Sequence, residues 1–199
     1  MKTYTGKTVD DAVSKACLDL GVTIDQLNYE VTLETKGLFS KKAEIACWTV
    51  EMVQEYIENL IRKILTDMQF EVETVSYVQD GRIYCNINTS NNSILIGKAG
   101  VILRAINLII KNAVSTTFKK RLEVSVDING YKEELYKKVA SMARRFGKTV
   151  LRTKADLKLD PMPADERKVM HQEIAKMDHL KTESKGEGKN RYMTISYVD

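Results

Sequence analysis

Apolar and polar residues alternate along residues 3–45 in a way that predicts a small unit of strand, helix, strand and strand. The helix begins at a capping-box spacing, with Thr8 followed by Asp11. Its apolar positions then recur at helical spacing, at Val13, Ala16, Cys17 and Leu20. Residues 29–35 alternate like a strand, and 43–48 offer a returning strand.

The next hundred residues predict the order helix, strand, strand, helix, strand and helix, which is an α+β arrangement. The first helix has one apolar stripe, formed by Val50, Val53, Ile57, Leu60, Ile61, Ile64 and Met68. Two alternating runs, 72–78 and 82–88, flank Asp80-Gly81, which is a strong hairpin signal. The remaining helix, strand and helix are predicted over residues 101–113, 121–128 and 133–150.

A proline-rich break at 160–163 separates a last segment, in which a helix over 164–177 precedes two short strands near 180–183 and 191–197. A polar loop at 184–190 joins these strands. The fold class is therefore α+β, in three domains that span residues 1–47, 48–150 and 151–199.

Composition narrows the class of protein. Apolar residues make up 43% and charged residues 29%, which is ordinary for a soluble globular chain. The longest apolar run, 101–110, is too short to cross a bilayer and is interrupted by Arg104 and Asn107. The N-terminus lacks the apolar region of a signal peptide. Three widely spaced cysteines suit reduced thiols, so the sequence predicts a cytoplasmic protein.

Charge is unevenly distributed along the chain. The net charge is +4, yet residues 91–150 alone hold 12 basic and 4 acidic side chains, a net charge of +8. The other segments, 1–45, 46–90 and 151–199, sum to −1, −4 and +1. Such an excess in one segment is typical of contact with an anionic partner.

A glycine turn lies within the basic segment, at Ile96-Gly97-Lys98-Ala99-Gly100. Two glycines around a cation and a small residue let a nucleic-acid backbone approach closely. The helix that follows presents N–H donors to phosphate. The spacing alone is weak, but its position between an apolar run and a helix strengthens it.

The two helices after this turn are predicted to have apolar core faces and basic outer faces. The core faces hold Ile102, Ala105, Ile106, Ile109 and Ala113 in the first helix, and Leu135, Val139, Met142 and Phe146 in the second. The outer faces hold Arg104, Asn107 and Lys111, then Lys137, Arg144 and Lys148. A solvated surface is the simpler reading of a charge run. Together with the glycine turn, the single-sign bias favours nucleic-acid contact, with Arg104 and Lys111 as candidate contacts.

The C-terminal segment carries a second pattern. Arg167 and His171 stand at i and i+4 on one predicted helix face. Ser184–Gly188 then precedes Lys189-Asn190-Arg191 and the terminal strand. Either feature alone is nearly uninformative, because a lone surface arginine and histidine usually have no function.

These two regions resemble known nucleic-acid-binding modules. The segment 48–150 is similar to a bacterial-type KH domain, in which the glycine turn clamps about four nucleotides beside an apolar groove. The resemblance assigns the clamp to Gly97, Lys98, Ala99 and Gly100. It leaves Ile96, Ile102 and Leu103 open as groove or core residues.

The segment 151–199 resembles the R-x-x-x-H domain, a small module that binds single-stranded nucleic acid. That resemblance implies phosphate contact by Arg167 and Arg191, with His171 supporting or contacting. Gly186 and Gly188 would shape the loop.

Over its whole length the chain resembles the bacterial Jag family, in which a βαββ unit precedes KH and R-x-x-x-H domains. The N-terminal match includes Lys7–Ala12 and Lys36–Phe39, and the chain departs from the family pattern at Ser40. The resemblance implies a regulator of cell elongation, division or sporulation. It also implies association with a membrane-protein complex.

The sequence predicts no enzyme, no cofactor and no metal site. Gly147-Lys148-Thr149 imitates the end of a phosphate-binding loop, but Met142 stands where the first glycine belongs. The favoured function is a single-stranded RNA-binding regulator. Single-stranded DNA remains open, because nothing here identifies a 2′-OH reader. A protein-interaction scaffold is the alternative, because the striped helix 48–68 could pack against a KH-protein partner or form a homodimer. The favoured interpretation of this stripe is that it covers the sheet of its own domain.

Overall fold

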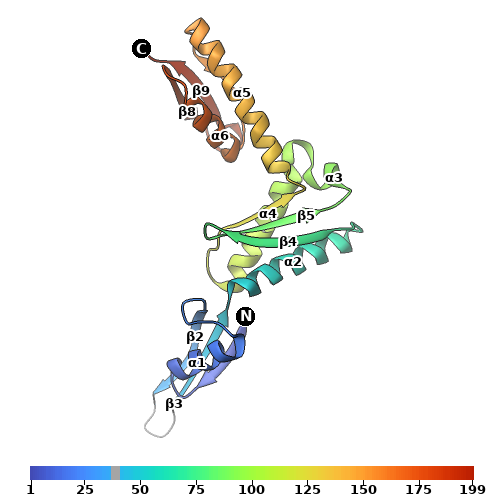
Figure 1. Ribbon diagram of the computed structural model, residues 1–199, viewed down its shortest axis with the longest axis vertical. Helices are drawn as coiled ribbons and strands as arrows, with labels where there is room; N and C mark the ends of the chain where they lie inside the picture. The colour runs from blue at the N-terminus through green and yellow to red at the C-terminus, as the bar shows by residue number, and fades with distance from the viewer. Residues whose placement is uncertain (37–40) are drawn as a thin grey trace. The chain divides into compact units, whose positions relative to one another are not determined.

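A computed structural model of the chain describes residues 1–36 and 41–199, which form two compact units, residues 1–129 and residues 130–199 (Figure 1). The family match at Lys36–Phe39, and the departure from it at Ser40, fall on residues 37–40 and the Lys36 side chain, which lie outside the described part. The described residues form helices and three-stranded sheets, which confirms the α+β class.

The first sheet and its helix form the N-terminal part of the first unit. The strands are β1 (Lys2–Gly6), β2 (Asn28–Lys36) and β3 (Lys41–Trp48), in the antiparallel order β1-β3-β2. Helix α1 (Val9–Leu20) begins as predicted, because the Asp11 N–H donates to Thr8 Oγ1 at 3.2 Å. The core between helix and sheet holds Ala12, Val13, Ala16, Leu27, Ile45 and Cys47.

The second sheet completes the first unit. Its strands are β4 (Glu73–Gln79), β5 (Arg82–Asn88) and β6 (Val124–Ile128). β4 and β5 pair antiparallel, and β5 and β6 pair parallel. Asp80 and Gly81 both have positive φ, as a tight hairpin turn requires. Helix α2 (Val50–Asp67) buries Val53, Ile57, Ile61 and Leu65, so much of its apolar stripe packs within the unit.

Helix α4 (Val101–Phe118) belongs to the same unit, and the face that it buries there differs from the predicted one. Its buried residues are Leu103, Ile110, Val114 and Phe118. Two residues predicted to lie in the core, Ile102 and Ile109, are 40% and 54% exposed. The prediction was wrong because apolar residues follow one another directly at 101–103 and 108–110, so that periodicity alone does not single out the buried stripe.

One helical segment in the described residues, Asn92–Phe118, is long and apolar enough to cross a membrane by length and composition alone. In the structure it is not one continuous helix. The short helix α3 (Asn92–Ile96) ends at Gly97, and the 3-10 turn η1 (Lys98–Gly100) separates it from α4. The buried face of α4 then packs on the second sheet and on α2.

The second unit consists of helices and one antiparallel sheet (Figure 1). Its elements are α5 (Tyr131–Thr153), β7 (Leu157–Lys158), α6 (Ala164–Ile174), β8 (Leu180–Lys185), the 3-10 turn η2 (Gly188–Asn190) and β9 (Tyr192–Tyr197). The strands are antiparallel in the order β7-β9-β8. The core holds Val139, Ala143, Val150, Leu159, Met170, Ile174, Met193 and Ile195.

Helix α5 differs from the sequence analysis, which placed it in the 48–150 segment. It shares the core of the second unit, where it packs against α6 and β9. Gly147 permits this approach, because a Cβ there would lie 2.6 Å from Met177 Sδ. Met142, which was predicted to be buried, is 42% exposed. The first unit therefore ends with the element order α2, β4, β5, α3, α4, β6, and α5 belongs to the second unit.

The position of α5 also changes the charge distribution. Residues 1–129 hold 15 basic and 16 acidic side chains, a net charge of −1. Residues 130–199 hold 16 basic and 11 acidic side chains, a net charge of +5. The basic segment of the sequence is thus divided between the two units, and the overall excess of positive charge lies in the second.

Candidate nucleic-acid interface

The glycine turn has a backbone that only certain residues adopt. Gly97 has φ 72° and ψ 173°, a region that is essentially restricted to glycine. A Cβ at this position would lie 2.7 Å from Ile102 Cγ1. Ala99 and Gly100 are left-handed, at φ 50° and 73°, and the Gly100 N–H donates to the Gly97 carbonyl at 3.1 Å. The turn is therefore a defined structure, and its conformation requires glycine at position 97.

The chemistry of the turn suits an anion. Lys98 and Ala99 are exposed at its tip, and helix α4 starts directly behind them. The first N–H groups of a helix lack partners within that helix and attract negative charge. Arg104 and Lys111 are exposed farther along α4. The turn and the first helical turns thus combine backbone donors with cations, as phosphate contact requires.

Asn107 has a structural role instead of a place on the basic surface. Its Nδ2 donates to the Val126 carbonyl at 2.8 Å, and its Oδ1 accepts from the Val126 N–H at 3.0 Å. The side chain thereby fastens α4 to β6. The sequence pattern had predicted that Asn107 lies on the outer face with Arg104 and Lys111, whereas its side chain is bonded to β6.

The second unit brings together the residues predicted from the C-terminal pattern. Arg167 and His171 lie on α6 and line a hollow of about 370 Å³ together with Arg191, which precedes β9. We call this hollow the α6 pocket. Its full lining is Ala164, Arg167, Lys168, His171, Thr182, Ser184, Arg191 and Met193. Sequence reasoning missed Lys168, Thr182 and Ser184.

Hydrogen bonds orient the two α6 side chains in this pocket. The half-buried Arg167 donates from Nε to the Met162 carbonyl and from Nη1 to Ser184 Oγ, both at 3.2 Å. His171 Nδ1 shares a hydrogen bond with Thr182 Oγ1. The guanidinium has five N–H groups, and these two bonds use only part of them. Strand β8 therefore fixes the orientation of the arginine and the histidine in the pocket.

The pocket lining is basic. Arg167, Lys168 and Arg191 are cations, and none of the lining residues is acidic. Nearby carboxylates have other partners in the second unit. Asp165 accepts from the Tyr136 hydroxyl at 3.0 Å, and Glu173 accepts from Arg144 Nη1 at 2.7 Å. Arginine forks, lysine and hydroxyl donors together suit recognition of a phosphate group.

Comparison with known families agrees with this organisation. The Jag N-terminus family matches residues 4–46, and the R-x-x-x-H domain family matches residues 137–197. The second match begins inside α5, in agreement with the packing of that helix in the second unit.

Relatives extend the match over nearly the whole chain. RNA-binding protein KhpB of Clostridium symbiosum is 29% identical, over 98% of this chain and 91% of the relative. RNA-binding protein KhpB of Bacillus subtilis is 28% identical, over 98% of this chain and 97% of the relative. The protein of the same name from Streptococcus pneumoniae is 27% identical, over 73% of this chain and 44% of the relative. With both domain matches in the same order along the chain, these similarities show that the chain belongs to the Jag family.

Proposed function

We propose that this chain is a non-enzymatic, cytoplasmic protein that binds single-stranded RNA through two sites, the α6 pocket and the glycine turn at 97–100. The observation that carries the proposal is the clustering of Arg167, His171 and Arg191 in one hollow. These residues come from two separate segments, and β8 orients two of them. The names of the relatives, each an RNA-binding protein, favour RNA as the ligand.

The α6 pocket is tested by exchanging its exposed cations. Lys168→Ala with Arg191→Ala should weaken binding of a labelled oligouridylate in a fluorescence-polarisation titration. It should also flatten the salt dependence, because each lost phosphate contact on a single strand lowers the slope of log K against log salt by about 0.7. Lys138→Ala with Lys148→Ala removes the same charge from exposed positions of α5 outside the pocket. Equal effects of both pairs would contradict a specific pocket.

The glycine turn is best tested at Ala99, because substitution of Gly97 would disturb the fold itself. Ala99 is exposed and already left-handed, a conformation that aspartate and asparagine tolerate well. Ala99→Asp therefore adds a negative charge without new backbone strain, and Ala99→Asn is its neutral match. We expect the aspartate variant to bind single-stranded RNA more weakly and the asparagine variant to bind normally. Equal affinities would exclude phosphate contact at the turn.

RNA and DNA are distinguished by competition. A DNA strand of the same sequence should displace the labelled RNA less effectively than unlabelled RNA, because a 2′-OH contact favours RNA. Equal competition would make the chain a general single-strand binder.

A second candidate function is supported by the surface of α4. Val101 and Leu108 are 54% and 60% exposed, and Ala105 lies between them on the same face. This stripe suits a homodimer or a KH-protein partner better than α2 does, because α2 buries its stripe within the unit. Leu108→Glu should lower the mass measured by light scattering if the chain self-associates, and Lys111→Glu should not. A monomer at all concentrations would exclude self-association.

A cellular role follows only from membership of the Jag family. We include in the proposal a regulatory function in cell elongation, division or sporulation, and association with a membrane-protein complex. A strain that lacks the gene should recover its cell length with the wild-type chain and with Ala99→Asn. It should not recover with the Lys168→Ala, Arg191→Ala variant if RNA binding is required.

A further inference from the structure

The sheet of the second unit has a second polar surface. In β9 the buried residues Met193 and Ile195 point toward α5 and α6, so the alternate residues point the other way. Strand register places β7 and β8 residues on that same side. We call this surface the outer face, formed by Lys158, Lys181, Glu183, Lys185, Tyr192, Thr194 and Ser196.

The outer face is basic. It holds three lysines and one acidic residue, Glu183. The Glu183 carboxylate lies 3.2 Å from Lys185 Nζ. Lys158 Nζ lies 4.4 Å from the centre of the Tyr192 ring, so that a cation–π contact holds this ammonium over the sheet. Lys181 is exposed on the neighbouring strand. Lys158 and Lys181 flank β9 from its two sides, since the strand order is β7-β9-β8.

The outer face joins the α6 pocket at one end of the sheet. Arg191 lines the pocket, and the next residue, Tyr192, lies on the outer face. In the same way Ser184 contacts Arg167 in the pocket, and the next residue, Lys185, is paired with Tyr192. Lys189 is exposed in the turn that connects the two strands. Lys185 and Lys189 therefore continue the positive charge from the pocket around the β8–β9 hairpin, and Glu187 is the one acidic residue of the turn 186–190.

We propose that a single strand of nucleic acid bound in the α6 pocket continues around this hairpin, with its phosphates on Lys158 and Lys181 of the outer face. The inference rests on the proposed function of the pocket and extends the contact to a longer strand. Charge complementarity and the unbroken path from Arg191 to Tyr192 favour a polyanion here. Tyr192 is a positioning residue, because it acts by holding Lys158.

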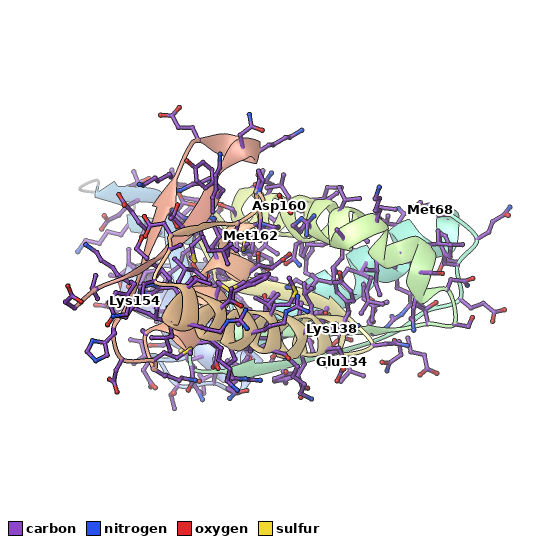
Figure 2. The ribbon with its side chains drawn as sticks, turned by 90° about the horizontal axis from the view of Figure 1, so that it is seen from above. Met68, Glu134, Lys138, Lys154, Asp160 and Met162 are labelled. Carbon is purple, nitrogen blue, oxygen red and sulfur yellow. The ribbon has the colours of Figure 1, made fainter. Side chains whose placement is uncertain are left out.

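The experiment is lysine footprinting on the full wild-type chain. The chain is acetylated with and without a strand of about twelve uridines, which is within the range of single-strand site sizes, and modified lysines are counted by mass spectrometry. We expect the strand to protect Lys168 in the pocket together with Lys158 and Lys181. Lys138, which lies on α5 one turn beyond Glu134, should react equally in both samples (Figure 2).

Substitutions on the outer face add a quantitative test. Lys158→Ala with Lys181→Ala should lower the salt slope for the long strand by about 1.4, the value for two lost phosphate contacts. For a strand of about four nucleotides, the length that a single KH turn clamps, the same variant should bind like wild type. Tyr192→Ala should lower protection of Lys158, whereas Tyr192→Phe keeps the ring and should not.

The outcomes separate the two proposals. Protection of Lys168 without protection of Lys158 and Lys181 would overturn the outer-face path and leave RNA binding by the pocket intact. Failure of the wild-type chain to bind either strand would overturn the proposed function, and the path with it. Loss of Lys158 and Lys181 reactivity with an acidic peptide, but not with RNA, would overturn the path and make the outer face a protein-binding surface.

Discussion

Replacement of Gly97 by alanine should destabilise the first unit more than replacement of any glycine that merely has positive φ. At φ 72° and ψ 173° a non-glycine residue costs about 1–3 kcal/mol. The added Cβ would lie 2.7 Å from Ile102 Cγ1, and moving that side chain off its rotamer costs roughly 0.5–1.5 kcal/mol. The expected loss is therefore about 1.5–4.5 kcal/mol in the free energy of unfolding.

The single tryptophan provides the assay. Trp48 is buried in the first unit, with its ring 5.4 Å from that of Phe118, so its fluorescence reports unfolding of this unit. The urea midpoint of Gly97→Ala should fall with an unchanged m-value. Gly81→Ala is the control, because Gly81 has φ 71° but no atom within 4 Å of an added Cβ. That variant should lose only about 1–2 kcal/mol, the cost of a left-handed residue.

A second substitution separates the two contributions. Ile102→Ala removes the atoms nearest the new Cβ, so the loss caused by Gly97→Ala should be smaller in that background than in wild type. The reasoning is refuted if the free energy of unfolding of Gly97→Ala lies within about 0.5 kcal/mol of the wild-type value, which is the usual effect of an ordinary surface substitution. It is also refuted if Gly81→Ala is equally costly.

Two further predictions concern polar contacts. Asn107→Ala removes both hydrogen bonds to the Val126 backbone and leaves its N–H and carbonyl unpaired. The free energy of unfolding in the same tryptophan-monitored titration should therefore fall by about 1–3 kcal/mol. Wild-type stability would contradict the role of Asn107 in joining α4 to β6. In the second unit, Lys176 and Arg144 hold the pKa of the Glu173 carboxyl below its ordinary value of 4.5, so these contacts stabilise the fold at neutral pH and are lost as the pH falls through the lowered pKa. Glu173→Gln should accordingly lower the Tm near pH 7 and approach wild type in acid, and a pH-independent difference in thermal melts would argue against the ion pairs.

Hydrophobic patterning predicted the position of a helix or strand correctly where the two faces of that element differ in polarity. Helix α2 and the β4–β5 hairpin lie within a residue or two of their predicted positions, because each has one clearly apolar side or a strong turn signal. The core face of α4 was predicted wrongly, because the consecutive residues Leu108, Ile109 and Ile110 are equally apolar although only Ile110 is buried. The short elements α3 and β7 carry too few residues to show a period.

Tertiary packing explains the remaining differences. Helix α5 follows β6 directly, so chain order favoured the first unit, but its apolar residues meet the core formed by α6 and β9. Gly147 resembled the end of a phosphate-binding loop, whereas its role is close helix packing against Met177.

The candidate site was predictable only in part. The spacing of Arg167 and His171 places them on one helix face, and the structure joins them to Arg191 in the α6 pocket. Thr182 and Ser184 carried no signal, because hydroxyl residues are common in strands and only their contacts with α6 bring them to the site. The glycine turn was recognisable from its glycines and the helix behind it, although the strained backbone of Gly97 emerges only in three dimensions.

The division of charge between the units has a kinetic consequence. A polyanion is attracted over a distance of about 10 Å at moderate ionic strength, so the unit with net charge +5 should capture a strand before the unit with net charge −1 does. If the glycine turn binds the same strand, as proposed, it does so at a high effective concentration because both units belong to one chain, and it then needs little intrinsic affinity. Encounter rates would thus be set by salt and the second unit, while the residence time would depend on whether the turn at Gly97–Gly100 engages.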